Sequence, residues 1–164
     1  TPEAPDLDTA LGGYPPEQTV HVTQQMIIDA RNGLSLASAG PIDSVALGSP
    51  HFSADECRAV LRLAQGKPFD VPVYICLGRH TVADLQTDGS DKALTDLGVE
   101  FVVDTCVVVT PILPAEPGVM MTNSAKFAHY ATGNTGHLPV FGTLADCVAS
   151  AQAGRVIWDQ GVWS

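Results

Sequence analysis

The apolar run VPVYICL, residues 71–77, is the stretch that decides the fold of this chain. Near-continuous apolar runs of this length are typical of strands buried on both faces of a parallel sheet. A helix is expected before it at residues 53–65, because Ser53 followed by Glu56 forms a capping-box pattern. A further strand is expected after it at residues 99–103. Strands that alternate with helices predict an α/β fold: an open, mostly parallel sheet with helices on both faces, as in a Rossmann-like three-layer domain.

The same alternation extends over most of the chain. Further strands are expected at residues 19–22, 43–47, 107–109, 139–141 and 156–158. Further helices are expected at residues 24–34, 81–97 (in two short pieces), 123–130 and 144–153. We assign residues 19–164 to one α/β domain, and residues 1–18 to a segment that connects it to a preceding portion of a longer protein.

Composition excludes several classes of function. The 164 residues include 8 Lys and Arg against 18 Asp and Glu, a formal charge of −10. Such a chain lacks the positive surface that neutralises phosphates, so we expect neither nucleic acid nor a membrane surface as a partner. No apolar run approaches the roughly 20 residues that span a bilayer. The N-terminal sequence TPEAPDLDTALGG lacks Met, a basic start and an apolar core, which does not fit a signal peptide and suggests a piece of a longer protein.

The four cysteines are Cys57, Cys76, Cys106 and Cys147. They are widely spaced and form no CxxC pattern, and a domain of this size does not need disulfides. We therefore expect a reduced, cytoplasmic setting. Cys57 falls inside a helix and Cys76 inside a buried strand, where burial disfavours the thiolate. For any one cysteine, packing is the default role.

Polar residues gather where expected strands lead into expected helices, which is where ligands bind in open α/β sheets. The four junctions are residues 48–53 with His51, residues 104–106 with Cys106, residues 120–130 with Lys126, and residues 142–147 with Cys147. Helix N-termini at these junctions favour a carboxylate or phosphate. The simpler interpretation is also open: ordinary caps such as Ser53, Thr143 and either Thr122 or Asn123, an exposed loop histidine, and an exposed lysine.

Nucleophilic catalysis has little support. GxSxG, P-loop, GxGxxG and HExxH patterns are absent from the sequence. A Cys–His hydrolase that pairs Cys106 with His51 or His129 stays open, although no spacing favours it.

Six blocks, in order across nearly the whole chain, resemble the large subunit of the aconitase X family. They are TPEAP at residues 1–5, LGSPHFS at 47–53, VYIC at 73–76 before Arg79, VVDTC at 102–106, MTNSAKFAHY at 121–130, and DCV at 146–148 followed by Ser150 and Ala151. A large subunit of that family has an N-terminal portion that would precede Thr1. It also works with a small swivelling subunit, separate or fused, to which the domain expected here is unrelated in fold.

The resemblance implies an iron-dependent hydro-lyase related to aconitase. Two substrates are associated with the family: cis-3-hydroxy-L-proline, dehydrated to Δ1-pyrroline-2-carboxylate, and mevalonate 5-phosphate. We expect the first, because the chain has only three lysines, which suits a bacterial mesophile and leaves few cations for a phosphate. The resemblance also implies three cysteine ligands around a [2Fe–2S] cluster or a single iron. Two of them would be Cys106 and Cys147, and the third would come from the missing portion.

These assignments fit one mechanism. Thiolates suit iron, and an incomplete cysteine shell leaves a position where substrate oxygen can bind. Iron would polarise the leaving hydroxyl while a base removes a proton from the neighbouring carbon. We expect the substrate carboxylate to be bound by Ser49, His51, Asn123 and Glu3, and catalysis to involve Ser124 and Lys126. The competing hypothesis is a metal-free α/β module that binds a small anionic ligand or serves in assembly.

Overall fold

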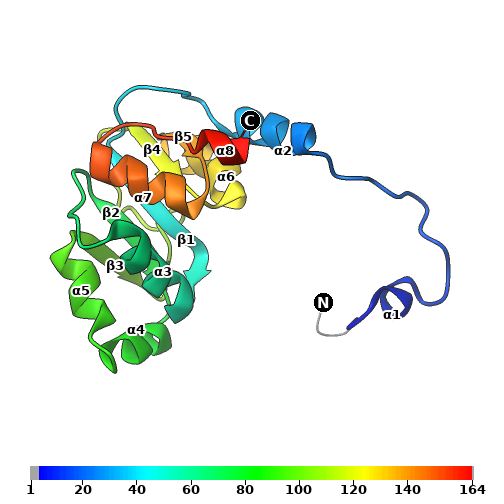
Figure 1. Ribbon diagram of the computed structural model, residues 1–164, viewed down its shortest axis with the longest axis horizontal. Helices are drawn as coiled ribbons and strands as arrows, with labels where there is room; N and C mark the ends of the chain where they lie inside the picture. The colour runs from blue at the N-terminus through cyan, green and yellow to red at the C-terminus, as the bar shows by residue number, and fades with distance from the viewer. Residues whose placement is uncertain (1–3, 164) are drawn as a thin grey trace.

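A computed structural model describes residues 4–163 and has a five-stranded parallel sheet at its centre (Figure 1). The strands are β1 (Ser44–Phe52), β2 (Val73–Leu77), β3 (Val99–Val103), β4 (Val119–Thr122) and β5 (Leu138–Phe141). Their order across the sheet is β3-β2-β1-β4-β5, and every named pair is parallel. The chain therefore builds outward from β1 in one direction and then in the other, as doubly wound folds do.

Helices connect the strands and cover both faces of the sheet. They are α1 (Leu7–Leu11), α2 (Gln24–Leu34), α3 (Ala54–Ala64), α4 (Arg79–Gln86), α5 (Ser90–Asp96), α6 (Ala125–Thr135), α7 (Leu144–Ala153) and α8 (Gln160–Trp163). Helices α3, α4, α5 and α7 contribute side chains to the larger core on one face, where α3 packs against α7. Helix α6 covers the other face, and α2 packs beside it against β5. The predicted three-layer α/β architecture is confirmed.

Alternation along the buried strands divides the core between the two faces. In β2, Val73, Ile75 and Leu77 belong to the larger core, whereas Tyr74 and Cys76 belong to the smaller one. The first set of side chains packs against α3 and α7. The second set packs against α6 and the loop that follows β3. All five residues of β2 are buried, which confirms the expectation for the VPVYICL run.

Three expected strands do not form. Residues 19–22 are extended but unpaired, and Val20 and Val22 remain 58% and 71% exposed, because no strand edge lies beside them. Residues 107–109 form turns on the way to Pro111, and residues 156–158 are irregular. Conversely, β4 was not expected, because its four residues follow the proline-rich loop of residues 104–118 and are too few to show a pattern.

The N-terminal arm, residues 4–23, leads away from the domain (Figure 1). It contains the short helix α1, which has no buried residue. Helix α2 follows at residues 24–34, as predicted, with Thr23 as its N-cap. Among the helices within residues 4–163, none is both long and apolar enough to cross a membrane.

A clasp near the C-terminus ties α2 to α7. The guanidinium of Arg31 lies over both Trp158 and Trp163, with its central carbon 4.3 and 4.9 Å from the ring centroids. The indole N–H of Trp163 donates to the buried carboxylate of Asp146 (2.8 Å), which also accepts the backbone N–H of Asp159 (2.7 Å). Both tryptophans thus pack at the edge of this domain.

Candidate functional site

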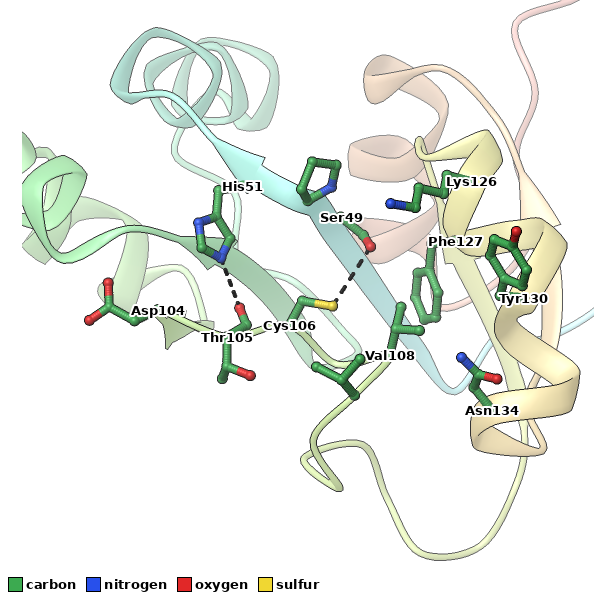
Figure 2. Close-up of a pocket in the computed structure, with 12 residues that line it drawn as sticks. Ser49, His51, Asp104, Thr105, Cys106, Val108, Lys126, Phe127, Tyr130 and Asn134 are labelled. Carbon is green, nitrogen blue, oxygen red and sulfur yellow. Dashed lines mark hydrogen bonds between the residues drawn. The ribbon is translucent and has the colours of Figure 1, made fainter.

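A cavity of about 510 Å³ opens where β1 and β3 end and α6 begins (Figure 2). It is lined by residues from three stretches that are far apart in sequence: Ser49, Pro50 and His51; Asp104, Thr105, Cys106, Val108 and Val109; and Lys126, Phe127, Tyr130 and Asn134. This is the edge of the sheet formed by the carboxyl ends of parallel strands, where α/β folds bind ligands. Four of the predicted site residues meet here: Ser49, His51, Cys106 and Lys126.

Gly48 makes the turn that brings Ser49 and His51 to the cavity. The register of β1 against β2 is interrupted between Leu47 and Phe52, so the intervening residues bulge out over the strand ends. Gly48 has a left-handed φ of 74°, and a Cβ there would collide with the backbone oxygen of Cys76. Only glycine fits both conditions.

Ser49 and Cys106 contact each other at the cavity. The Ser49 hydroxyl lies 3.8 Å from the Cys106 thiol (Figure 2). The Cys106 residue is partly exposed, unlike the other three cysteines. His51 Nε2 lies 3.2 Å from the backbone oxygen of Thr105, so this nitrogen carries a proton and donates it. His51 therefore braces the loop next to Cys106 through its backbone.

Ser124 contacts the backbone of Ser49, in a role the sequence did not predict. It is the N-cap of α6, where Thr122 or Asn123 had been expected, and its hydroxyl oxygen accepts the N–H of Phe127 (3.1 Å). The same hydroxyl donates to the backbone oxygen of Ser49 at 2.6 Å. Its single proton is therefore engaged in fixing Ser49.

Asn123 lies next to the main cavity, in a smaller one of about 210 Å³ that it lines with Ser49 and Ser124. Its side-chain oxygen is buried without a hydrogen-bond partner. Unpaired buried oxygens of this kind are costly and suit a site where a ligand supplies the donor. Glu3 lies outside the described residues.

Helix α6 supplies one wall of the cavity. Lys126, Tyr130 and Asn134 recur every four residues and so lie on one face of the helix. Lys126 is the one cation among the lining residues, it is exposed, and within residues 4–163 no ion pair is formed by its ammonium. Figure 2 shows its side chain on the same side of the cavity as Ser49. Tyr130 and Asn134 were missed from the sequence, although their four-residue spacing from Lys126 was a usable signal.

Asp104 also lines the cavity; the sequence placed it in a polar junction but gave it no role. Its φ of 60° is left-handed, which is uncommon for residues other than glycine. Its carboxylate accepts hydrogen bonds from the backbone N–H of Arg79 (2.9 Å) and from the side-chain Nε–H of Arg79 (2.6 Å). These two interactions hold the pKa of the Asp104 carboxyl below its usual range. Asp104 thus connects the end of β3 to the start of α4, two residues before Cys106.

Cys147 lies elsewhere. It is completely buried in α7, inside the larger core on the opposite face of the sheet from the cavity. Desolvation raises the pKa of its thiol strongly, and the neighbouring Asp146 carboxylate adds to the effect. The structure does not bring Cys147 and Cys106 together. Within residues 4–163, no cluster of three or more His, Cys, Asp or Glu side chains is arranged to hold a metal ion.

Residues 42–153 match the family model for the aconitase X third domain, which is more than half of the chain. The chain belongs to the aconitase X family. Its sequence is 41% identical to cis-3-hydroxy-L-proline dehydratase of Pseudomonas aeruginosa and 35% identical to the enzyme of that name from Hypocrea jecorina. Each match covers 94% of this chain and 27% of the relative, so the chain spans about a quarter of the length of these proteins.

Two archaeal proteins extend the comparison. The large subunit of phosphomevalonate dehydratase from Methanocaldococcus jannaschii is 26% identical over 79% of this aconitase X chain and 32% of its own length. The crystal structure of the holo-form of Thermococcus kodakaraensis aconitase X is similar with a TM-score of 0.68 and 25% identity, over 77% of this chain and 33% of that one. The predicted family and fold are therefore confirmed.

Proposed function

We propose that the protein containing this chain is a hydro-lyase that dehydrates cis-3-hydroxy-L-proline to Δ1-pyrroline-2-carboxylate. The observation that carries the proposal is the 41% identity to the Pseudomonas aeruginosa enzyme of that substrate, sustained over 94% of the chain. The cavity supports it, because a hydroxyl, a thiol and a cation converge there at the carboxyl ends of the strands.

The reaction sets three requirements for the site. The substrate loses its hydroxyl from C3 and a proton from C2, so water leaves and an enamine forms that tautomerises to the cyclic imine. The site must hold the carboxylate on C2, assist departure of the hydroxyl and remove the C2 proton. The first two requirements can be compared with groups in the cavity.

Lys126 is the group we assign to the substrate carboxylate. Its ammonium has no ion-pair partner among the described residues, and it lies in the first turn of α6, where the helix dipole also favours an anion. Asn123 and Ser49 are the further contacts, since the unpaired oxygen of Asn123 accepts from a substrate N–H or O–H and the Ser49 hydroxyl is close at hand. Ser124, predicted as catalytic, is in our proposal a positioning residue that fixes Ser49.

Cys106 fits the iron centre that the family relationship implies, because it is a partly exposed thiol in the cavity. When bound, iron would supply Lewis acidity toward the leaving hydroxyl. The other residues here do not complete such a centre: Cys147 is buried on the far face, and its surroundings do not fit a ligand. The proposal therefore takes from this chain one thiol ligand and the carboxylate site, and no further part of the metal chemistry.

The second candidate substrate is mevalonate 5-phosphate, because the archaeal relatives are phosphomevalonate dehydratases. A phosphate carries up to two charges, and sites for it usually present several cationic or N–H groups. The cavity offers Lys126 as its one cation, and the identity to the Methanocaldococcus jannaschii protein is 26%. Both observations favour the hydroxyproline substrate.

The remainder of the protein is part of the proposal. The N-terminal arm has exposed apolar side chains, with Leu7 at 71% and Tyr14 at 78% exposure. Isolated exposed apolar residues are common, but an arm without buried residues of its own gains stability only by packing against something else. We assign this surface to a preceding portion of the protein, and we retain a small subunit, separate or fused, as the second partner.

The test uses the complete protein and two lysine variants. In Lys126→Met the carboxylate loses a charged hydrogen bond worth about 1.5–3 kcal/mol, so kcat/KM for cis-3-hydroxy-L-proline should fall roughly 10- to 100-fold. The matched control is Lys92→Met, because Lys92 is an exposed lysine paired with Asp96 on α5, away from the cavity, and it should leave kcat/KM unchanged. Turnover of mevalonate 5-phosphate in place of hydroxyproline would contradict the proposal, as would equal effects of the two substitutions. A complete protein that turns over neither compound and holds no iron would support the metal-free module.

A further inference from the structure

The two cysteines expected to bind iron lie on opposite faces of the sheet. Cys106 follows β3 and packs beside the smaller core, which includes Cys76, Val107 and Phe127. Cys147 belongs to the larger core with Leu47, Ile75 and Val148. The sheet itself lies between these two cores, whereas thiolates that share one metal centre each bond to it at about 2.3 Å, as in zinc sites. The sheet therefore separates two thiols that a common centre needs side by side.

The surroundings of Cys147 also lack what a ligand requires. Its exposed area is 0%, and its backbone N–H donates to the Thr143 oxygen at 3.0 Å inside the capping box that begins α7. Its neighbours in the larger core are apolar, and the charged group next to it is the Asp146 carboxylate, which disfavours a thiolate. Exposing this sulfur would require α7 to leave the sheet.

The other two cysteines do not replace it. Cys57 is fully buried in α3 on the same face as Cys147. Cys76 is on the same face as Cys106, but it is fully buried within β2. A metal ligand must be deprotonated and reachable. Cys106 is the one partly exposed cysteine among residues 4–163.

We infer that Cys147 is a core-packing residue and that this domain gives the iron centre a single thiolate, Cys106, so the remaining ligands come from parts of the protein outside residues 4–163. The inference rests on the proposed function for the presence of iron. The iron site is then shared between domains, which makes its assembly depend on how the rest of the protein meets the cavity at Ser49 and Cys106.

The experiment is iron and acid-labile sulfide analysis of the complete protein, purified anaerobically, with four forms compared: wild type, Cys106→Ser, Cys147→Ala and Cys76→Ala. We expect the iron content of Cys106→Ser to be at least tenfold lower than that of the wild type. The visible absorption of the centre should be lost with it. Cys147→Ala and Cys76→Ala should keep the wild-type iron content and spectrum while their Tm falls, because each leaves a cavity in a core. Loss of iron from either alanine variant with native circular dichroism would overturn the inference.

A second measurement keeps the outcome clear if an alanine variant fails to fold or if the wild type holds no iron. Native wild-type protein, with and without chelator, is treated with iodoacetamide, and the labelled cysteines are identified by mass spectrometry. We expect Cys147 to stay unlabelled in both samples and to react after denaturation, and Cys106 to become labelled when chelator is present. Labelling of native Cys147 at a rate close to that of Cys106 overturns the inference. Absence of iron from the wild type would contradict the iron centre and with it the ligand role of Cys106, whereas the burial of Cys147 is tested independently by the labelling.

Discussion

The two faces of the sheet differ in what fills them. On one face, which we call the packed face, α3, α4, α5 and α7 close a large apolar core that includes Val60, Leu94 and Cys147. On the other face, which we call the site face, α6 and the irregular loop of residues 104–118 leave cavities, and polar residues of the candidate site line the larger of them. The difference shows how one parallel sheet serves two purposes. The densely packed face supplies most of the stability, and the less densely packed face leaves room for a ligand.

The largest effect on the free energy of unfolding should come from a substitution that creates a cavity in the core of the packed face. Leu94 is fully buried in the larger core, so Leu94→Ala should lower the free energy of unfolding by about 2–5 kcal/mol. Val109 lines the cavity and is 75% exposed, so Val109→Ala should change it by less than about 0.5 kcal/mol. Urea unfolding of the two variants tests the contrast. A loss at Val109 as large as that at Leu94 would mean that the site face carries a comparable share of the stability.

Two helix caps, one on each face, give a matched comparison. Thr143 caps α7 and Ser124 caps α6, so replacing either with alanine should cost about 1 kcal/mol of stability. Only Ser124 also donates to Ser49, so Ser124→Ala should in addition lower kcat of the complete protein severalfold, whereas Thr143→Ala should not. Unfolding curves and steady-state kinetics on both variants separate the two contributions. Equal kcat values for the two would remove the positioning role of Ser124.

The Asp104–Arg79 pair at the cavity predicts a pH dependence of stability. Hydrogen bonds from Arg79 lower the pKa of the Asp104 carboxyl, so its contribution to stability is complete above about pH 4, the value for an unfolded chain. The contribution is lost as the pH falls through the lower pKa of the folded state. Asp104→Asn should therefore flatten the acid side of the stability profile. Asp96→Asn, in an exposed pair with Lys92, is the control, and an identical change in both profiles would show that the Arg79 contact is not the cause.

The sequence predicted more about the packed face than about the site face, for a physical reason. Capping boxes at Ser53 and Thr143 and the apolar run of β2 are local signals, and each led to an element within one or two residues of its observed bounds. The strand expected at residues 19–22 failed because β-branched residues favour a strand only when another strand lies beside them.

The site depended on contacts that no local pattern encodes. Ser49, Cys106 and Lys126 were identified and meet in one cavity, but Asp104 was given no role, because its left-handed backbone and its link to Arg79 arise from tertiary structure. For Cys147 the residues alone favoured packing, and it was the family resemblance that implied a ligand. Its position on α7, one residue before Val148 and four before Ala151, places it on the face of the helix that packs on the sheet. Helical spacing would have predicted its burial.

The clasp of Arg31 between Trp158 and Trp163 has a mechanical consequence. Helix α2 is the last element of the N-terminal stretch before the sheet, and it is joined by this stacked arrangement to residues that lie more than a hundred positions later. These contacts join the N-terminal stretch to the C-terminal residues and, through the Trp163 indole, to the Asp146 carboxylate in the first turn of α7. A neighbouring part of the protein that displaces α2 would therefore also disturb Trp158 and Trp163, which pack against Arg31.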